Sequence, residues 1–304
     1  MDAPPMSEAQ WLREREHGSA FGIKALLFTY RVCGRRFVGV ILRVVAFYYA
    51  LFAGNARRAS QAYLRRVNGR ASFFDTVRHI ATFARCAFDR VLLAAGKLDG
   101  FTFTRDGYQH LEQLAAQKRG AILLGAHLGS FEAMRAMGSH EQFPINVVVH
   151  FENARRITAM LRAVAPDFDA RIIAIDPAAP HWVLQVQECI EKGELVAVLG
   201  DRTGLGEASV EVELLGGTVR LPTGPYALAA VLRCPIYLTF GLFHPPSTYA
   251  LSCEPFADKV ELPRGRREEA LRALTQRYAE RLEVYIRRAP LCWFNFFELW
   301  SPPQ

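Results

Sequence analysis

The segment Gly120–Glu132 places the strongest constraint on the fold. An apolar run over residues 121–125 ends in small residues, and His127 then precedes Glu132 by five positions. Inside one α-helix two such residues would point about 140° apart, because each residue turns the helix by about 100°. They can meet only if His127 lies in a turn and Glu132 lies in the first turn of a helix that begins at Ser130. The segment therefore predicts a buried strand, a turn that carries His127, and a helix.

This pair of side chains suits proton transfer. A neutral imidazole accepts a proton from a hydroxyl, and a carboxylate fixes its tautomer and stabilises the imidazolium that forms. We interpret His127 as a general base and Glu132 as the group that orients it, with no serine nucleophile. The alternative is a buried histidine that hydrogen-bonds a nearby acid for structural reasons. The glycines around His127 and the N–H groups at the start of the helix favour a pocket.

From residue 100 onward, predicted strands and helices alternate. Alternation of this kind indicates an α/β fold, with a mainly parallel central sheet flanked by helices. Two glycines at 216 and 217 lie between alternating apolar runs and predict a hairpin. The strands are expected at 101–104, 121–125, 145–150, 171–175, 195–199, 210–215, 218–221, 236–242 and 249–253, and the helices at 108–118, 130–137, 154–164, 182–192, from 225 onward and at 266–288.

The N-terminal region is basic and apolar. Residues 1–70 hold 12 Lys and Arg against 4 Asp and Glu, and Phe37–Ala56 contains a single charge, Arg43. A nucleic-acid-binding arm is rarely so apolar, so we expect an anionic membrane surface as the partner and no nucleic acid. The run is long enough to span a bilayer, but Arg43 would be costly at its centre, which favours a helix that lies in the interface. A buried core helix is the remaining alternative.

We therefore expect N-terminal hydrophobic, basic helices over residues 1–96 and an α/β catalytic region over residues 97–304, forming one continuous domain. The first ten residues do not resemble a cleavable signal peptide, so the catalytic part is expected in the cytoplasm. The six cysteines lack paired spacing, which is typical of reduced thiols and not of a disulfide framework or a zinc site.

A second buried strand also ends in polar residues. The run 195–200 leads into Asp201 and Arg202, and ligands of open α/β sheets bind beyond such strand ends. Arg202 could hold a phosphate or a carboxylate while Asp201 positions the loop, or both could lie in a surface turn. Arg155 and Arg156, which follow the predicted strand ending at His150, form a weaker candidate anion clamp. The sequence contains no serine-hydrolase elbow, phosphate-binding loop or His-Glu-x-x-His metal motif.

The block His127–Glu132 resembles the His-x4-Asp/Glu block of the glycerolipid acyltransferase superfamily, especially the His-x-Gly-Asn-Trp-Glu form of bacterial lipid A biosynthesis acyltransferases. The residues at 200–202 resemble the Gly-Asp-Gln block of that family, and residues 214–235 resemble the hairpin, helix and strand that follow it. The aromatic end at 292–300 is similar to that of relatives, some of them associated with aryl polyene pigment clusters.

The resemblance implies a glycerolipid acyltransferase-like fold and an O-acyltransferase. A fatty or polyenoic acyl group would move from an acyl carrier protein or CoA thioester to a hydroxyl of a membrane lipid or glycolipid. The protein would act at the cytoplasmic face of the inner membrane, without a metal or another cofactor. His127 would be the base, and backbone N–H groups near Gly129 or basic side chains would stabilise the oxyanion.

The substrate would contact residues at the ends of the strands. These are Gly129, Ser130, Phe131, His150, Arg155, Arg156, Asp201 and Arg202. Ser130 and Phe131 replace the Asn-Trp of the lipid A enzymes, and His150 and Arg202 stand where arginine and glutamine are common, so the acceptor is expected to differ from lipid A. A non-catalytic lipid-binding or scaffold protein on the same fold and a soluble hydrolase are the competing functions.

Overall fold

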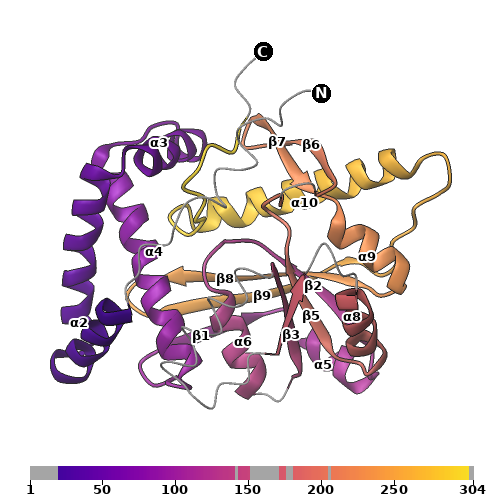
Figure 1. Cartoon of the computed structure of the whole chain (residues 1–304), viewed down its shortest axis with the longest axis horizontal. Helices are drawn as coiled ribbons and strands as arrows, with labels where there is room; N and C mark the ends of the chain where they lie inside the picture. Colours follow the sequence, from indigo (N-terminus) through magenta and orange to yellow (C-terminus); the bar gives the residue numbers. More distant parts are fainter. Residues whose placement is uncertain (1–19, 141–142, 151–170, 176–180, 205–206, 301–304) are drawn as a thin grey trace.

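The computed structural model describes residues 20–140, 143–150, 171–175, 181–204 and 207–300 of the 304-residue chain. Its centre is a seven-stranded sheet of order β1-β9-β8-β2-β5-β3-β4, and β6 and β7 form a separate hairpin (Figure 1). Within the large sheet, β8 and β9 pair in antiparallel orientation, and the other neighbouring strands pair in parallel. The strands are β1 (Thr102–Asp106), β2 (Ala121–Gly125), β3 (Ile145–His150), β4 (Ile172–Ile175), β5 (Leu195–Leu199), β6 (Ser209–Leu214), β7 (Gly217–Pro222), β8 (Ile236–His244) and β9 (Thr248–Ala257).

Helices cover both faces of this sheet, with α10 on one side and α5 and α6 on the other (Figure 1). All five residues of β2 are buried: Ile122 and Leu124 belong to the core cluster that includes α10, and Leu123 belongs to one that includes α5. Burial on both faces explains the unbroken apolar run. The predicted α/β fold class is confirmed. The helices of this region are α5 (Tyr108–Ala116), α6 (Phe131–His140), α8 (His181–Glu191), α9 (Gly224–Leu232) and α10 (Arg267–Arg288).

Among the described residues, three helices precede the sheet: α2 (Ala20–Phe52), α3 (Gly54–Asn68) and α4 (Phe73–Ala94). The helix α4 begins with a capping box in which Ser72 and Asp75 exchange hydrogen bonds. It packs along α2, where Val38 and Leu42 are buried against Phe88 and Leu92. The hydrophobic, basic N-terminal helices that the sequence predicted are present.

The opposite side of α2 is also apolar, but it faces solvent. Val44 is 65% exposed and Phe52 is 70% exposed. No single helix among the described residues is long and apolar enough to cross a membrane. Residues 25–52 of α2 meet that test only together with α3, from which they are bent by 100°. The exposed large apolar side chains of α2 are Phe28, Val32, Phe37, Val40, Val44, Val45, Phe47, Tyr48, Tyr49, Leu51 and Phe52.

A buried ionic cluster joins α2 and α4 to the sheet. Asp89 of α4 is fully buried and pairs with Arg35 of α2 and, at 3.4 Å, with Arg85. The hydroxyl of Tyr249 on β9 donates to the same carboxylate at 3.0 Å. Removing one partner of a buried ion pair commonly costs about 3–5 kcal/mol. This cluster therefore fixes where the N-terminal helices meet the sheet.

One detail of the hairpin differs from the sequence prediction. The residues that turn the β6–β7 hairpin are Leu215 and Gly216, both with positive φ, whereas Gly217 is the first residue of β7. Positive φ at both central positions is the geometry of a two-residue type I′ turn. The helix predicted at 154–164 lies outside the described residues.

After α10 the chain returns across the N-terminal helices. The hydroxyl of Tyr63 on α3 donates to the carbonyl of Pro290 at 2.7 Å. Nε2 of His79 on α4 lies 2.8 Å from the carbonyl oxygen of Trp293, and its Nδ1 lies 2.9 Å from the hydroxyl of Ser60. The indole of Trp300 donates to the carbonyl of Leu214 at the end of β6. The C-terminal segment is thus held at several points.

The lowered pKa of His79 makes the stability of the folded protein depend on pH. Its ring is completely buried, and burial lowers its pKa from 6.5 to about 4, although the hydrogen bond to Trp293 opposes that shift. Because the unfolded chain binds this proton and the folded chain does not, stability falls as pH falls from 6.5 towards 4. We expect His79 to account for about 2 kcal/mol of lost unfolding free energy between pH 7 and pH 5.

Urea unfolding at both pH values checks this expectation. The variant His79→Gln, which cannot gain a proton, should show a pH dependence that is weaker by about that amount. The control His244→Gln removes an exposed histidine and should keep the full dependence. Equal pH dependence in the wild type and in His79→Gln would contradict the interpretation.

Candidate active site

The register of two neighbouring strands brings His127 and Asp201 together. Strands β2 and β5 pair in parallel, with Gly125 opposite Leu199, and the ladder continues through a hydrogen bond from Gly200 N to Gly125 O. His127 and Asp201 each follow two residues after that last pair. The structure therefore unites at one sheet edge the two strand ends that the sequence analysis singled out separately.

The Asp201 carboxylate is completely buried and accepts four hydrogen bonds. Oδ1 lies 2.8 Å from Nδ1 of the His127 ring. Oδ2 accepts from the backbone N of His127 at 3.0 Å, the indole of Trp293 at 2.9 Å and the amide of Asn295 at 3.2 Å. Since an ionised carboxylate only accepts, Nδ1 of His127 carries the proton. The lone pair of the neutral ring is then on Nε2, which no described residue hydrogen-bonds.

The C-terminal segment also holds the backbone of the His127 turn. Leu128 and Trp293 form an antiparallel bridge. Phe294 N donates to His127 O at 2.9 Å, and Gly129 N donates to Cys292 O at 2.7 Å. The turn is therefore fixed between β5 on one side and the C-terminal segment on the other.

Gly129 and Ser130 shape the start of α6. Gly129 has a φ of +76°, and a Cβ there would lie 1.9 Å from the carbonyl oxygen of Gly241 on β8. Ser130 N donates to that carbonyl, and its buried Oγ accepts from Ala133 N, which caps the helix. Because the N–H groups of Gly129 and Ser130 are both used within the fold, the expected oxyanion role of amides near Gly129 does not fall to these two.

Glu132 has a different partner from the one expected. Its Oε2 lies 3.1 Å from Nε of Arg90 on α4, whereas the ring nitrogen of His127 that bonds a carboxylate bonds Asp201. In the first turn of α6 the Glu132 side chain lies against α4 and not against the β5 edge. The carboxylate that orients His127 in the structure is therefore Asp201.

Electrostatics favour a neutral histidine beside an ionised aspartate. Desolvation and the positive charge of Arg202 lower the pKa of His127, and Asp201 opposes this shift. Burial by itself raises the pKa of Asp201, but the hydrogen bond with His127, the positive charge of Arg202 and the hydrogen bond from Trp293 hold that pKa well below the usual range. The side chain of His127 is 31% exposed, so its ring can meet a substrate.

Arg202 is tied to the C-terminal segment. Its Nε donates to Oδ1 of Asn295 at 2.7 Å and its Nη2 donates to the carbonyl of Phe294 at 2.8 Å. The guanidinium carbon also lies 5.5 Å from the ring centroid of Phe297. Asp201 and Arg202 therefore belong to the site and do not form a surface turn, which was the alternative interpretation. The binding of an anion by Arg202 stays a prediction.

Of the remaining predicted contacts, only His150 lies among the described residues. His150 ends β3, next to β5 in the sheet, while Arg155 and Arg156 lie outside the described residues. Sequence reasoning missed Trp293, Asn295 and Arg90 as neighbours of the site. The polar residues at the ends of the two buried strands could have indicated a pairing of His127 with Asp201, but nothing local marked the C-terminal contacts.

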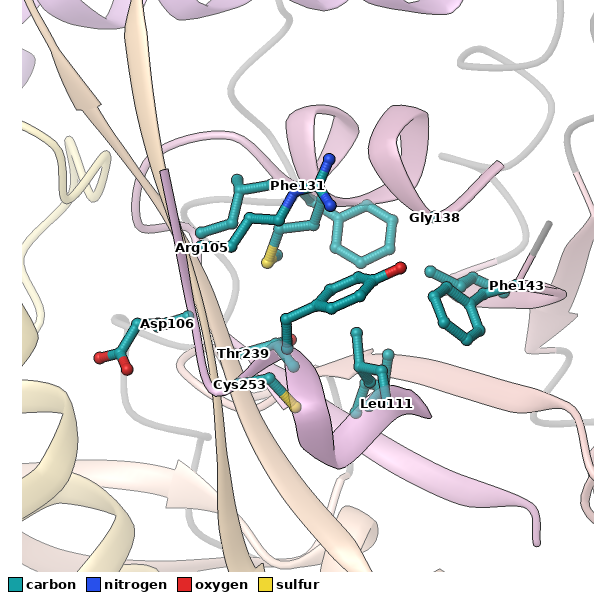
Figure 2. A pocket seen from close by; sticks show the side chains of 14 residues that line it. Arg105, Asp106, Leu111, Phe131, Gly138, Phe143, Thr239 and Cys253 are labelled. Atoms are coloured by element: carbon teal, nitrogen blue, oxygen red, sulfur yellow. The ribbon is translucent and has the colours of Figure 1, made fainter. Parts of the chain in front are cut away.

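Phe131 lines an apolar cavity beneath α6. Figure 2 shows Phe131, Leu111 and Phe143 directed into this space, while the Asp106 carboxylate points away from it. The cavity has a volume of about 50 Å³, which is smaller than the range of about 300–1,000 Å³ common for ligand pockets. Its other lining residues are Arg105, Tyr108, Leu123, Met134, Gly138, Ile145, Thr239, Leu251, Ser252 and Cys253.

Within the described part of the chain, no cluster of three or more His, Cys, Asp or Glu is placed to hold a metal ion.

Comparison with known families gives one match. The model of the family described as bacterial lipid A biosynthesis acyltransferase matches residues 76–301, which include β1–β9, α6 and the C-terminal segment. No curated protein matches the chain.

The two carboxylates can be distinguished by the titration of His127. Asp201→Asn should lower the pKa of His127 further, because it removes the charge that opposes desolvation. Glu132→Gln should change that pKa less, since Glu132 pairs with Arg90. Nitrogen chemical shifts of labelled histidine measured against pH check this. A larger effect from Glu132→Gln would restore Glu132 as the orienting group.

Proposed function

Because the chain belongs to the bacterial lipid A biosynthesis acyltransferase family, we propose that it transfers a fatty or polyenoic acyl group from an acyl carrier protein or CoA thioester to a hydroxyl of a membrane lipid or glycolipid. Membership of this family indicates acyl transfer to a lipid acceptor. The acyl-transfer chemistry proposed here rests on the His127–Asp201 pair, in which a partly exposed histidine side chain is hydrogen-bonded through Nδ1 to a buried carboxylate.

The first step is attack by the acceptor. Nε2 of His127 takes the hydroxyl proton as the oxygen attacks the thioester carbonyl carbon, and Asp201 stabilises the imidazolium through Nδ1. The lowered pKa of His127 keeps the ring neutral and ready to accept at neutral pH. No protein nucleophile is needed, because the hydroxyl attacks directly.

The second step is collapse of the tetrahedral intermediate. The carbon–sulfur bond breaks, the ester is released, and the proton on Nε2 passes to the leaving thiolate, so His127 returns to its neutral form. The oxyanion formed between the steps needs donors or positive charge. Arg90 and Arg202 are both close enough to lower the pKa of His127, which supports the basic side chains as stabilisers, the second of the two sources the sequence suggested.

The small apolar cavity suits a short segment of the hydrocarbon part of a donor. It is lined by Phe131, four residues after His127, and by other apolar side chains of α5, α6 and the sheet. Burial of a hydrocarbon chain gains about 0.8 kcal/mol per methylene. An apolar cavity next to the His127 turn is therefore the arrangement expected of an enzyme that handles acyl chains.

The exposed apolar side of α2 suits a membrane surface. A contiguous exposed apolar surface usually marks an interaction site, and the exposed Arg31, Arg36 and Arg43 lie on the same helix. Apolar side chains enter the lipid interface while arginines meet anionic headgroups. We therefore place the protein on the cytoplasmic face of the inner membrane, with α2 in the interface, where it would meet a lipid acceptor and a soluble acyl carrier.

Loss of the base should abolish most turnover. We expect His127→Ala to lower acyl transfer by roughly 10²–10⁴-fold, the usual contribution of a general base. The measurement is transfer from acyl carrier protein thioesters to a membrane lipid extract, with the acylated lipid identified by mass. The control His181→Ala, at the exposed start of α8, should keep normal turnover. Near-normal transfer by folded His127→Ala would exclude the base assignment, and release of free fatty acid instead of acylated lipid would indicate a hydrolase.

Membrane binding should depend on the apolar side of α2. We expect the triple variant Val40→Asn, Val44→Asn, Phe52→Ser to reduce binding to vesicles of phosphatidylethanolamine and phosphatidylglycerol roughly tenfold or more, because three exposed apolar side chains that would enter the lipid are lost. Wild-type protein should stay bound in high salt, since salt screens charges only. The control Leu184→Asn, Val231→Asn alters exposed apolar residues elsewhere and should bind normally. Full release of wild type by salt would leave electrostatics as the sole anchor.

A further inference from the structure

We propose that Trp293 is a positioning residue of the active site, which holds Asp201 through its indole N–H and thereby sets the orientation of the His127 ring. The inference rests on the proposed function only for its kinetic consequence. The geometric consequence can be measured on the protein itself.

The Trp293 indole provides one of the four N–H groups that hydrogen-bond the buried Asp201 carboxylate. Trp293 is fully buried, and its Nε1 lies 2.9 Å from Oδ2 of Asp201. That oxygen has no solvent, so its charge is balanced only by protein donors. If the indole donor is lost, the carboxylate has one bond fewer to fix its plane, and Oδ1, which meets the His127 ring, is free to shift.

Trp293 is itself held from several sides, as a positioning residue must be. Its ring packs edge-on against the rings of Tyr63 and Trp300, with centroid-to-centroid distances of 5.3 Å and 6.1 Å. Its carbonyl accepts from Nε2 of the neutral His79 on α4. Its backbone pairs with Leu128 beside the catalytic histidine. The indole therefore has one position, set by α3, α4 and the His127 turn together.

Trp300 provides a matched control within the same cluster. It is also a buried tryptophan, it contacts Trp293, and its indole donates to the carbonyl of Leu214 and not to Asp201. The changes Trp293→Phe and Trp300→Phe remove the same atoms and one indole hydrogen bond each. Any difference between them in the behaviour of His127 reports the bond to Asp201.

The experiment compares the two variants by nitrogen NMR of labelled histidine and by kinetics of acyl transfer. In the wild type and Trp300→Phe we expect the His127 tautomer with the proton on Nδ1. In Trp293→Phe we expect a mixture of tautomers and a kcat lowered roughly tenfold, the loss of one hydrogen bond to a charged group, with KM changed less than kcat. Melting temperatures of both variants show whether each remains folded.

If Trp293→Phe does not fold, replacement of Trp293 by its isostere with sulfur in place of the indole N–H keeps the shape and removes only the donor. The proposal is overturned if a folded variant without the donor shows the tautomer and the kcat of Trp300→Phe. If wild-type protein transfers no acyl group, the proposed function fails, and the tautomer comparison still decides the role of Trp293.

Discussion

The rest of the candidate active site depends on the hydrogen bonds that surround the buried carboxylate of Asp201. An ionised group without solvent is costly unless it is paired and hydrogen-bonded, and Asp201 satisfies this requirement by drawing donors from the His127 turn and from the C-terminal segment. Each donor is in turn fixed by a neighbour: the turn by the backbone pairing at Leu128, and Asn295 by Arg202. The strand ends and the C-terminal segment therefore stabilise one another through a single charge.

The helix α4 connects the exposed apolar side of α2 to this site. Along its length it presents His79 to the carbonyl of Trp293, Asp89 to the ionic cluster with α2, and Arg90 to Glu132 on α6. The same helix buries one side of α2, which leaves the other apolar side exposed. A single helix thus carries both the packing that leaves one side of α2 exposed and the contacts that surround the His127 turn.

Much of the fold followed from local patterns in the sequence, and the pairing inside the site did not. The apolar runs that became β2 and β5 are buried on both faces, so their length and composition predict strands. The five-residue spacing correctly required His127 to precede the helix. The same spacing suggested Glu132 as its partner, because proximity in sequence was the only proximity available. The true neighbour of the ring lies 74 residues away, across a parallel strand pair. Trp293 and Asn295 are still farther from His127 in the sequence. They lie in a segment without regular secondary structure, so hydrophobic periodicity cannot predict their contacts.

The positions of the site residues along the chain also affect when the site can form. Contacts between residues far apart in sequence form late, because loop-closure entropy must be overcome before they stabilise the chain. Asp201 bonds a residue 74 positions before it and another 92 positions after it. During synthesis the whole sheet can be complete while this carboxylate still lacks the hydrogen bonds from the Trp293 indole and the Asn295 amide, which stabilise its charge in the interior. A nascent chain that has not yet docked its last segment would therefore hold a hydrated, unoriented aspartate, and the complete arrangement around His127 would form only when that segment docks.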